Sequence, residues 1–435
     1  MNETQMNILA LPTPNLGYHN QILGGFRALS DLSGLPYNPE AFLWPEGVEN
    51  IGGFKNSFFQ SKRENYEALK SRVFSLLERY LEKTGQIPHI FITVYDATDS
   101  KFSPENVDMV CRAVKEYYMN HNLGEIITAI LTSRLHRYKY IDLINVPKHM
   151  LTFRSRIRLL QNREIKKKVL VTVGTINNFN RRNVLEKYKE LLEKINNSSA
   201  DEIVAEQCQK LKRYMALSKK AVFCLGGRVD GPEIVFDLNY AKKILADAMR
   251  LCRCGYGVAI VNGPRTPNDV VDFLYEKTID MENILFQNCK KVIEDEADHG
   301  NWRIYSGKYE KQLKSLEKLG NIYPGIIGFD NTVVVHSMDS YAGCETAAAA
   351  FPTAISSRGL FIDPVVRYDC HNLKDLLCPK YAIDWDDFIN IADHMGVEPK
   401  DLRPQVLSNP LRVFAEAVIN RMNQKNKSKA KRKRG

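Results

Sequence analysis

The chain has 435 residues, of which 44% are apolar and 26% are charged, and this composition excludes a disordered or fibrous protein. At the usual size of about 100–200 residues per domain, we expect two or three domains. No apolar run reaches the roughly 18–20 residues of a membrane span, and the first residues lack the basic start of a secretory signal, so we expect a cytoplasmic protein. The nine cysteines show no C-x-x-C pair and no zinc-like spacing with histidine, which favours reduced thiols and predicts no metal centre.

The net charge of +10 is concentrated in two segments. Residues 425–434 carry +7 and residues 154–168 carry +6, so the rest of the chain carries −3. A body of this charge predicts no specific nucleic-acid partner. The basic segments favour peripheral contact with an anionic membrane, and the alternative for both is a solvated linker and a solubilising tail.

In the first third of the chain, short β-branched runs alternate with helical patterns, as in an α/β domain with a parallel sheet. The predicted strands are residues 8–11, 89–96, 125–133 and 140–146. The predicted helices are residues 21–33, 62–83 and 103–120. The last of these has Ser103 as a plausible N-cap and Pro104 as its first helical residue.

The alternation stops in the basic residues 147–168 and then starts again. Further strands are predicted at residues 168–174, 221–227, 256–263, 331–337 and 351–356, with helices between them and a last helix at 410–422. We therefore predict an N-terminal α/β domain over residues 1–155 and a C-terminal α/β domain over residues 156–405. A helix within residues 406–424 is expected to return to the N-terminal domain, and residues 425–435 are expected to form a disordered basic tail.

The predicted fold class is thus α/β, with two Rossmann-like domains whose parallel sheets face a cleft. Ligands of such sheets bind beyond the carboxyl ends of the strands, so the loops that follow strands are the candidate site. In the second half of the chain these loops are "GGRVDG" (226–231), "NGPRTPND" (262–269) and "HSMDSYAGCETAAAA" (336–350).

The residue types in these three loops suit a phosphate or a sugar hydroxyl. Paired glycines let a ligand approach the backbone, arginines pair with phosphate, and a helix N-terminus attracts anions. Each feature alone also has a structural explanation as a tight turn, a helix cap or a charge that complements the helix dipole. The candidate donor-binding residues are Gly226, Gly227, Arg228, Arg265, Thr266 (also a plausible N-cap), Asp339, Ser340 and Glu345. Together they favour a nucleotide or nucleotide-sugar, and the lack of a P-loop or a helix-opening G-x-G-x-x-G argues against an NTPase or a dinucleotide oxidoreductase.

Six fragments, in the same order along the chain, resemble the Elm-type mitochondrial-fission family and its bacterial relatives, whose sequences are similar to GT-B glycosyltransferases. The fragments are "LGYHNQILGGFRAL", "YIDLINVPKH", "KVLVTVGTIN", "LGGRVDGPEIVFD", "RTP" and "NTVVVHSMDSYAGCETA". The sequence departs from the family pattern by one position at His19, since Tyr18 precedes it, and Gly263-Pro264 replaces the first Ser-Arg of S-R-R-T-P.

The resemblance implies a GT-B-like fold with the acceptor on the N-terminal domain and the nucleotide-sugar on the C-terminal domain. In such a fold the first strand-to-helix loop faces the cleft, which here holds Gly17, Asn20 and Gln21. His19 is then the first candidate for a general base, because an imidazole has a near-neutral pKa, and Asp96 is the second. The alternatives are that Asn20 caps the helix, that Gln21 ties two loops together and that Asp96 caps a turn.

The predicted function is transfer of a sugar from a nucleotide-sugar donor to an acceptor, such as a lipid-linked or cell-envelope molecule. The resemblance places Glu345 at the ribose hydroxyls. No cofactor or bound metal is expected, because cationic side chains and helix N-termini can stabilise the leaving diphosphate, and "DWDD" (384–387) is interpreted as the acidic start of a helix.

Two alternatives remain open at this stage. The first is a non-catalytic GT-B-like scaffold in a peripheral membrane process, which should tolerate loss of His19 and Glu345. The second is a nucleotide-sugar epimerase, which would act on the donor without an acceptor.

Overall fold

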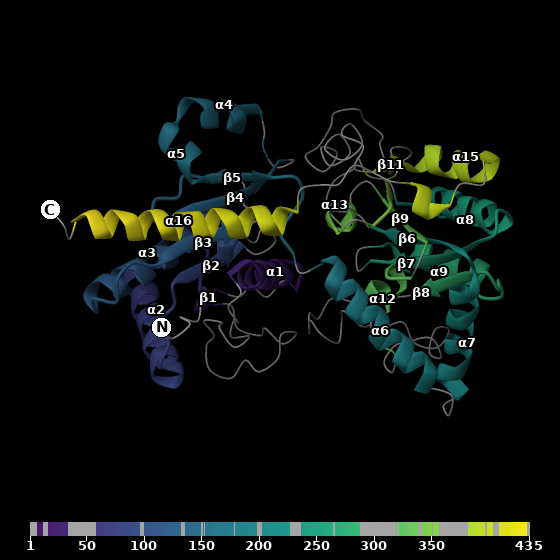
Figure 1. Cartoon of the computed structure of the whole chain (residues 1–435), viewed down its shortest axis with the longest axis horizontal. Helices are drawn as coiled ribbons and strands as arrows, with labels where there is room; N and C mark the ends of the chain where they lie inside the picture. Colours follow the sequence, from purple (N-terminus) through teal and green to yellow (C-terminus); the bar gives the residue numbers. More distant parts are fainter. Residues whose placement is uncertain are drawn as a thin grey trace. The chain divides into compact units, whose positions relative to one another are not determined.

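The computed structural model divides into unit 1, formed by residues 1–178 and 408–435, and unit 2, formed by residues 179–407 (Figure 1). Described are residues 7–11, 16–33, 58–95, 100–131, 135–148, 151, 153–177, 179–197, 202–226, 236–263, 266–287, 319, 322–329, 331–337, 342–349, 351–355, 382–395, 398–402 and 409–432. Within these ranges, only the backbone is described for residues 16–20, 202–204, 206–207, 342–344, 355, 394–395 and 426–432.

The sheet of unit 1 is parallel throughout its described strands, which follow one another in chain order, β1-β2-β3-β4-β5. Its strands are β1 (Ile8–Ala10), β2 (Ile90–Val94), β3 (Ile127–Leu131), β4 (Leu143–Pro147) and β5 (Val169–Thr172). Apolar side chains cover both faces of such a sheet, and accordingly β1 to β4 are buried along their whole length.

Helices cover both faces of this sheet. On one face, α2 (Tyr66–Thr84) and α3 (Pro104–Asn120) pack against a core that includes Phe91 and Ile130. The short 3-10 helix η1 (Ser100–Phe102) leads into α3, where Ser103 accepts a hydrogen bond from the Asn106 amide as the predicted N-cap and Pro104 is the first helical residue. On the other face, α1 (Leu16–Ser33) and α16 (Pro410–Arg432) pack against Ile92 and its neighbours.

The C-terminal helix α16 returns to unit 1 and packs along α1. Its buried residues Leu411, Phe414, Ala415 and Val418 recur at helical spacing and form one apolar face. The helix continues to Arg432, so the prediction of a disordered tail is wrong for residues 425–432. Lysine, alanine and arginine are good helix formers.

Close packing requires a glycine at residue 24 of α1. A Cβ atom built on Gly24 would lie 2.2 Å from the backbone of Asn177, in the segment that follows β5. The helix and this segment therefore touch through their main chains, which explains a glycine in the middle of a helix.

The boundary between the units differs from the predicted one at residue 155. Residues 169–172, predicted as the first strand of the second domain, form β5 and pair with β4 in the sheet of unit 1, from Ile144 opposite Val169 to Pro147 opposite Thr172. The basic segment before β5 folds into two short helices of the same unit, α4 (Phe153–Gln161) and α5 (Arg163–Lys168). The contacts of the chain accordingly divide after residue 178.

The sheet of unit 2 is also parallel in its described strands, but its order, β11-β10-β9-β6-β7-β8, is not the chain order. Its strands are β6 (Lys219–Leu225), β7 (Tyr256–Asn262), β8 (Ile284–Gln287), β9 (Thr332–His336), β10 (Thr353–Ile355) and β11 (Ile383–Asp384). The sequence analysis missed β8 and β11, which have four and two residues.

Two groups of helices cover the faces of this second sheet. One core lies under α8 (Leu238–Arg253), α9 (Asn268–Thr278) and α15 (Trp385–Met395). The other lies under α6 (Arg181–Asn197), α7 (Glu202–Ala216) and α12 (Tyr323–Ile327). The remaining short elements are α13 (Ala342–Ala348) and the 3-10 helix η4 (Pro399–Asp401).

These two α/β units with parallel sheets confirm the predicted fold class, while the facing of their sheets across a cleft stays a prediction. None of the described helices combines the length and the hydropathy that crossing a bilayer requires.

Candidate functional site

The strand order of unit 2 identifies one position in its sheet where a ligand is expected. Numbered within the unit, the order β8-β7-β6-β9-β10-β11 is 3-2-1-4-5-6, the order of dinucleotide-binding α/β folds. The strand order reverses between the parallel neighbours β6 and β9: β7 and β8 follow β6 toward one edge of the sheet, whereas β10 and β11 follow β9 toward the other edge. In such sheets ligands bind in the crevice beyond the carboxyl ends of the strands at this switch point.

Hydrogen bonds tie together the residues that follow β6, β7 and β9. The amide of Gly226, after β6, donates to Ser337 Oγ, after β9, over 2.9 Å. The carbonyl of Gly226 accepts a 2.6 Å hydrogen bond from Thr266 Oγ1, which also accepts one from the Gly263 amide over 3.0 Å. A Cβ atom on Gly263 would lie 3.0 Å from the Leu225 carbonyl oxygen, so the two loops approach through their backbones. These hydrogen bonds therefore hold the backbone of the loops in place at the switch point.

Thr266 has a different local role from the predicted one. It is fully buried, and its hydroxyl serves Gly226 and Gly263 instead of capping a helix. Helix α9 begins at Asn268 with Pro267 in the N-cap position and no side-chain cap, so the predicted N-cap is wrong. Thr266 holds the loops after β6 and β7 together.

A buried polar network connects β9, α13 and β10 beside these loops. Nε2 of His336, the last residue of β9, lies 3.1 Å from Thr346 Oγ1 on α13. The Thr346 hydroxyl also lies 3.1 Å from that of Thr353 on β10. Burial lowers the pKa of His336 to about 3, so its ring is neutral at physiological pH. The network fixes α13, whose half-buried Glu345 precedes Thr346 in the first turn.

Gln287 is a site feature that sequence reasoning missed. It ends β8 beside Val261 of β7, it is fully buried, and neither atom of its side-chain amide has a hydrogen-bond partner among the described residues. Burying an unpaired amide costs about 1–3 kcal/mol, so this residue is an exception that calls for a reason. The available signal was a polar residue at the end of the apolar run "NILFQ".

The N-terminal candidates lie at the start of α1 in unit 1. The helix begins at Leu16 instead of Gln21, so Gly17, His19 and Asn20 belong to its first turns and not to a loop. Asn20 therefore does not cap the helix. Gln21 is buried, and its Oε1 atom has no hydrogen-bond partner in the part of the chain that the structure describes.

Several predicted site residues lie outside the described part of the chain. These are Asp96, Gly227, Arg228, Arg265, Asp339 and Ser340. The side chains of Gly17, His19 and Asn20 are outside it as well. Of the donor set, the structure thus brings Gly226, Thr266 and Glu345 to the carboxyl edge of the second sheet.

The carboxylates of "DWDD" serve helix α15. Asp384 accepts a hydrogen bond from the Asp386 amide over 2.9 Å, and Asp386 and Asp387 lie in the first turn, as predicted. Buried Asp247 on α8 accepts 2.8 Å and 2.9 Å hydrogen bonds from Trp385 Nε1 and Lys243 Nζ. Burial opposes the charge of Lys243, but its bonds to Asp247 and Asp386 outweigh that effect and raise its pKa. Within the described residues, no three His, Cys, Asp or Glu side chains gather as metal ligands.

Comparison with known proteins gives structural neighbours only. No protein-family model and no curated protein matches the chain, so the resemblance to the Elm-type family finds no support. A UDP-GlcNAc 2-epimerase from Methanocaldococcus jannaschii is 12% identical, with 97% of this chain and 100% of that chain covered and a TM-score of 0.47. The same enzyme from Neisseria meningitidis, bound to UDP-GlcNAc, is 12% identical, with coverages of 96% and 100% and a TM-score of 0.41. MurG from Acinetobacter baumannii is 9% identical, with coverages of 97% and 99% and a TM-score of 0.34. No residue role follows from likenesses of this size.

Proposed function

We propose that unit 2 binds the nucleotide part of a nucleotide-sugar beyond β6 and β9, and that the chain transfers the sugar to an acceptor as a GT-B-like glycosyltransferase. The observation that carries the proposal is the 3-2-1-4-5-6 strand order, since it defines one switch point. Two of the three donor loops follow β6 and β9, which flank this point, and the third follows β7, the neighbour of β6. The hydrogen bonds among Gly226, Thr266 and Ser337 support it, because loops that are already held in place bind a ligand without the entropic cost of ordering them.

The proposed donor contacts follow from the chemistry of the loops. Arg228 and Arg265 pair with the diphosphate, and the glycine-rich turn after β6 lets the phosphates approach the backbone. Glu345 accepts hydrogen bonds from the ribose hydroxyls, with α13 held by the His336–Thr346 contact. Asp339 and Ser340, which follow β9 in the chain, contribute polar groups beside the donor. Charge on the leaving diphosphate is balanced by arginine, so no metal is invoked.

The acceptor is proposed to bind at unit 1, where α1 follows the carboxyl end of β1. His19 is the proposed general base that takes the proton of the acceptor hydroxyl, with Asp96 as the second candidate. Gly17, Asn20 and Gln21 would then shape the acceptor side of the site. The acceptor class proposed is a lipid-linked or cell-envelope molecule.

The first experiment is a thermal-shift screen of the full chain against UDP, GDP, CMP, ADP and their sugars. A ligand present at 100 times its Kd stabilises the folded state by about 2.7 kcal/mol. We expect one nucleotide to raise Tm, and we expect Glu345→Gln and Arg265→Ala to abolish that rise. The matched controls are Glu193→Gln on α6 and Arg253→Ala at the end of α8, both exposed and outside the loops that follow β6, β7 and β9.

The outcomes separate the alternatives. If no nucleotide raises Tm, or if the site variants and the controls respond alike, the proposed donor site is wrong and a non-catalytic scaffold becomes the better description. If a nucleotide-sugar binds and its sugar changes configuration by NMR without an acceptor, the enzyme is an epimerase. Release of free nucleotide that depends on an added acceptor, and is lost in His19→Ala, supports the transferase.

A further inference from the structure

Helix α4 in unit 1 exposes an unusual amount of apolar surface. It follows β4 in the chain and stands beyond the edge strand β5 (Figure 1), and it buries none of its residues. Phe153 and Leu160 at its two ends are 78% and 79% exposed. Single exposed apolar residues are common on protein surfaces, but two on one short helix call for an explanation.

Helix geometry places these residues on one face. Phe153, Ile157 and Leu160 are spaced by four and three residues, so they lie within about 60° of one another around the helix axis. Leu159 packs against the core of unit 1 and points about 130° away from the middle of this stripe. The stripe therefore faces away from the folded body.

Arginines border the stripe on both sides. Arg154 lies on one side and Arg156 on the other. Arg158 lies beyond Arg154, about 130° from the middle of the stripe, and all three arginines are exposed. None of them forms an ion pair with a described carboxylate. This pattern, an apolar stripe bordered by cations, is typical of helices that lie in the plane of a membrane interface.

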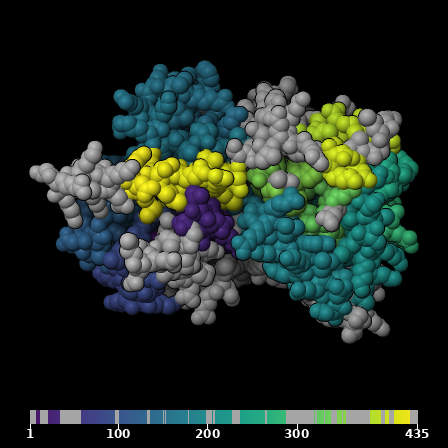
Figure 2. All heavy atoms as spheres, in the orientation of Figure 1, coloured from purple at the N-terminus to yellow at the C-terminus, as the bar shows by residue number. Residues whose placement is uncertain are grey.

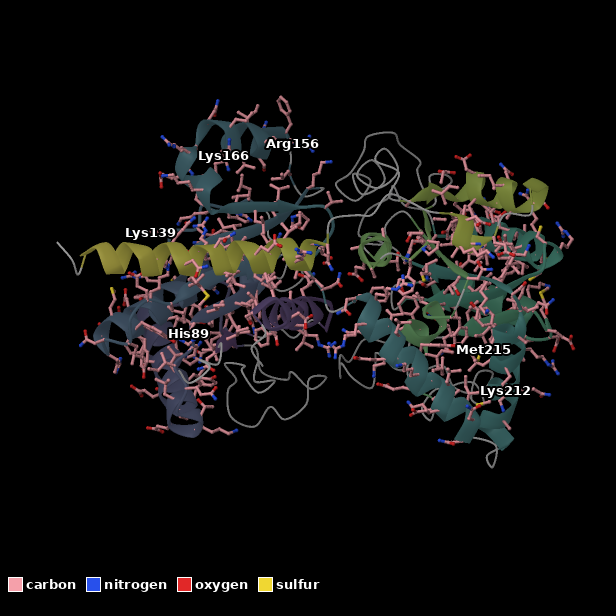
Figure 3. The ribbon with its side chains drawn as sticks, in the orientation of Figure 1. His89, Lys139, Arg156, Lys166, Lys212 and Met215 are labelled. Carbon is pink, nitrogen blue, oxygen red and sulfur yellow. The ribbon has the colours of Figure 1, made fainter. Side chains whose placement is uncertain are left out.

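Helix α5 extends the positive surface. Arg163 and Lys166 are exposed, and the one acidic residue of the segment, Glu164, is paired with Lys167 over 2.7 Å. Arg156 on α4 and Lys166 on α5 lie on the part of the unit that stands beyond β5 (Figure 3). In the space-filling view, α4 and α5 form a raised part of the surface next to α16 (Figure 2).

The two helices are fixed to the unit. Lys168 Nζ donates hydrogen bonds to the carbonyls of Tyr138 and Lys139 over 3.3 Å and 3.1 Å. Arg421 of α16 donates to the carbonyl of Lys167. Ile165 packs against the same core as Leu159. The basic segment is therefore already fixed in place, so the chain loses little conformational entropy when it binds through this surface.

We propose that α4 and α5, the α4–α5 surface, dock unit 1 on an anionic lipid bilayer. Phe153 and Leu160 enter the boundary between headgroups and acyl chains, and the arginines contact the lipid phosphates. The same cations would suit nucleic acid, but an aliphatic Leu160 in the middle of a cationic surface gains nothing from phosphates, whereas it gains from an acyl interior. The proposal is independent of the nucleotide site in unit 2.

The charge contribution sets the expected size of the effect. A basic residue near an anionic surface strengthens binding by about fivefold, so loss of three arginines should weaken binding by up to about a hundredfold. The same binding should fall steeply as salt rises, because exposed charges are screened over about 10 Å at 0.1 M salt.

The test is co-sedimentation of the full chain with vesicles of phosphatidylcholine alone and of phosphatidylcholine with 30% phosphatidylglycerol, at about 0.05 M and 0.5 M salt. We expect binding to the anionic vesicles at low salt alone. Both Arg154→Ala/Arg156→Ala/Arg158→Ala and Phe153→Ser/Leu160→Ser should weaken it more than tenfold. In Phe153→Trp, tryptophan emission should shift to the blue when anionic vesicles are added.

Matched controls remove the same groups elsewhere. Lys189→Ala/Lys212→Ala/Lys242→Ala takes three exposed cations from unit 2, and Met119→Ser/Leu185→Ser takes two exposed apolar side chains. Both controls should bind like the wild type, and Met119→Trp should give no blue shift. The proposal is overturned if the wild type does not bind anionic vesicles, if the controls weaken binding as much as the α4 variants, or if Phe153→Ser/Leu160→Ser binds unchanged. Tighter binding to RNA than to vesicles, lost with the arginines alone, would also overturn it.

Discussion

The buried imidazole of His336 makes the stability of unit 2 depend on pH in a way that can be calculated. Burial lowers its pKa in the folded state to about 3, whereas an unfolded histidine titrates near about 6.5. Between these values the unfolded state binds a proton that the folded state does not, so the free energy of unfolding falls as pH falls. From pH 7 to pH 5 this one residue should remove about 2 kcal/mol, at about 1.36 kcal/mol per unit below the unfolded pKa.

The assay is urea denaturation at pH 7.0 and pH 5.0, followed by the fluorescence of Trp385, which is buried in the core of unit 2. Replacing the other two tryptophans, Trp44 and Trp302, by phenylalanine makes Trp385 the sole reporter. We expect the loss between the two pH values to be about 2 kcal/mol smaller in His336→Gln than in the wild type. The control His121→Gln removes an exposed histidine and should keep the wild-type loss.

Equal losses in the wild type and in His336→Gln would refute the reasoning. They would mean that the folded state accepts a proton at His336 as easily as the unfolded chain does. The ring would then have access to water or to an acidic partner, and its proposed role of fixing α13 in a dry core would be wrong.

Three further substitutions test the energetics of the fold, each by urea denaturation. Gln287→Met should stabilise the protein without ligand by about 1–2 kcal/mol, since it removes a buried amide that has no partner among the described residues; a loss of stability would show that the amide is satisfied. Asp247→Asn should cost about 1–2 kcal/mol, less than the 3–5 kcal/mol of a fully buried pair, because Lys243 is partly exposed and keeps a second carboxylate; an unchanged midpoint would contradict this. Gly24→Ala should cost at least about 1–3 kcal/mol, because its Cβ would overlap the Asn177 backbone, and the usual gain of alanine over glycine in a helix would disprove that contact.

The sequence was sufficient for the fold class and for most elements of the core. The run "HIFITVYD" is rich in β-branched residues and bounded by polar ones, a pattern that favours a buried strand, and it forms β2. The N-cap at Ser103 was predictable because capping is local chemistry. The domain boundary was not, since "KVLVTV" has the pattern of a strand in either sheet and only pairing with β4 decides its place.

The site was predictable in part for the same reason. A glycine-rich turn after a strand is visible in sequence, whereas the order of the strands is a property of the whole sheet. Only the order shows that β6 and β9 are neighbours and that Gly226 meets Ser337 from 111 residues away. The start of α1 was placed five residues late because a glycine and an asparagine near its first turns favour a loop, yet tertiary packing extends the helix over them.

Hydrogen–deuterium exchange of the full chain, with and without the nucleotide that raises Tm most, locates the binding site most directly. A nucleotide at the switch point of unit 2 predicts slower exchange in peptides that cover residues 226–236, 263–268 and 337–346, with no change in peptides from α2 and α3. Protection confined to unit 1, or no protection in any of the three segments that follow β6, β7 and β9, would contradict a nucleotide site at this edge.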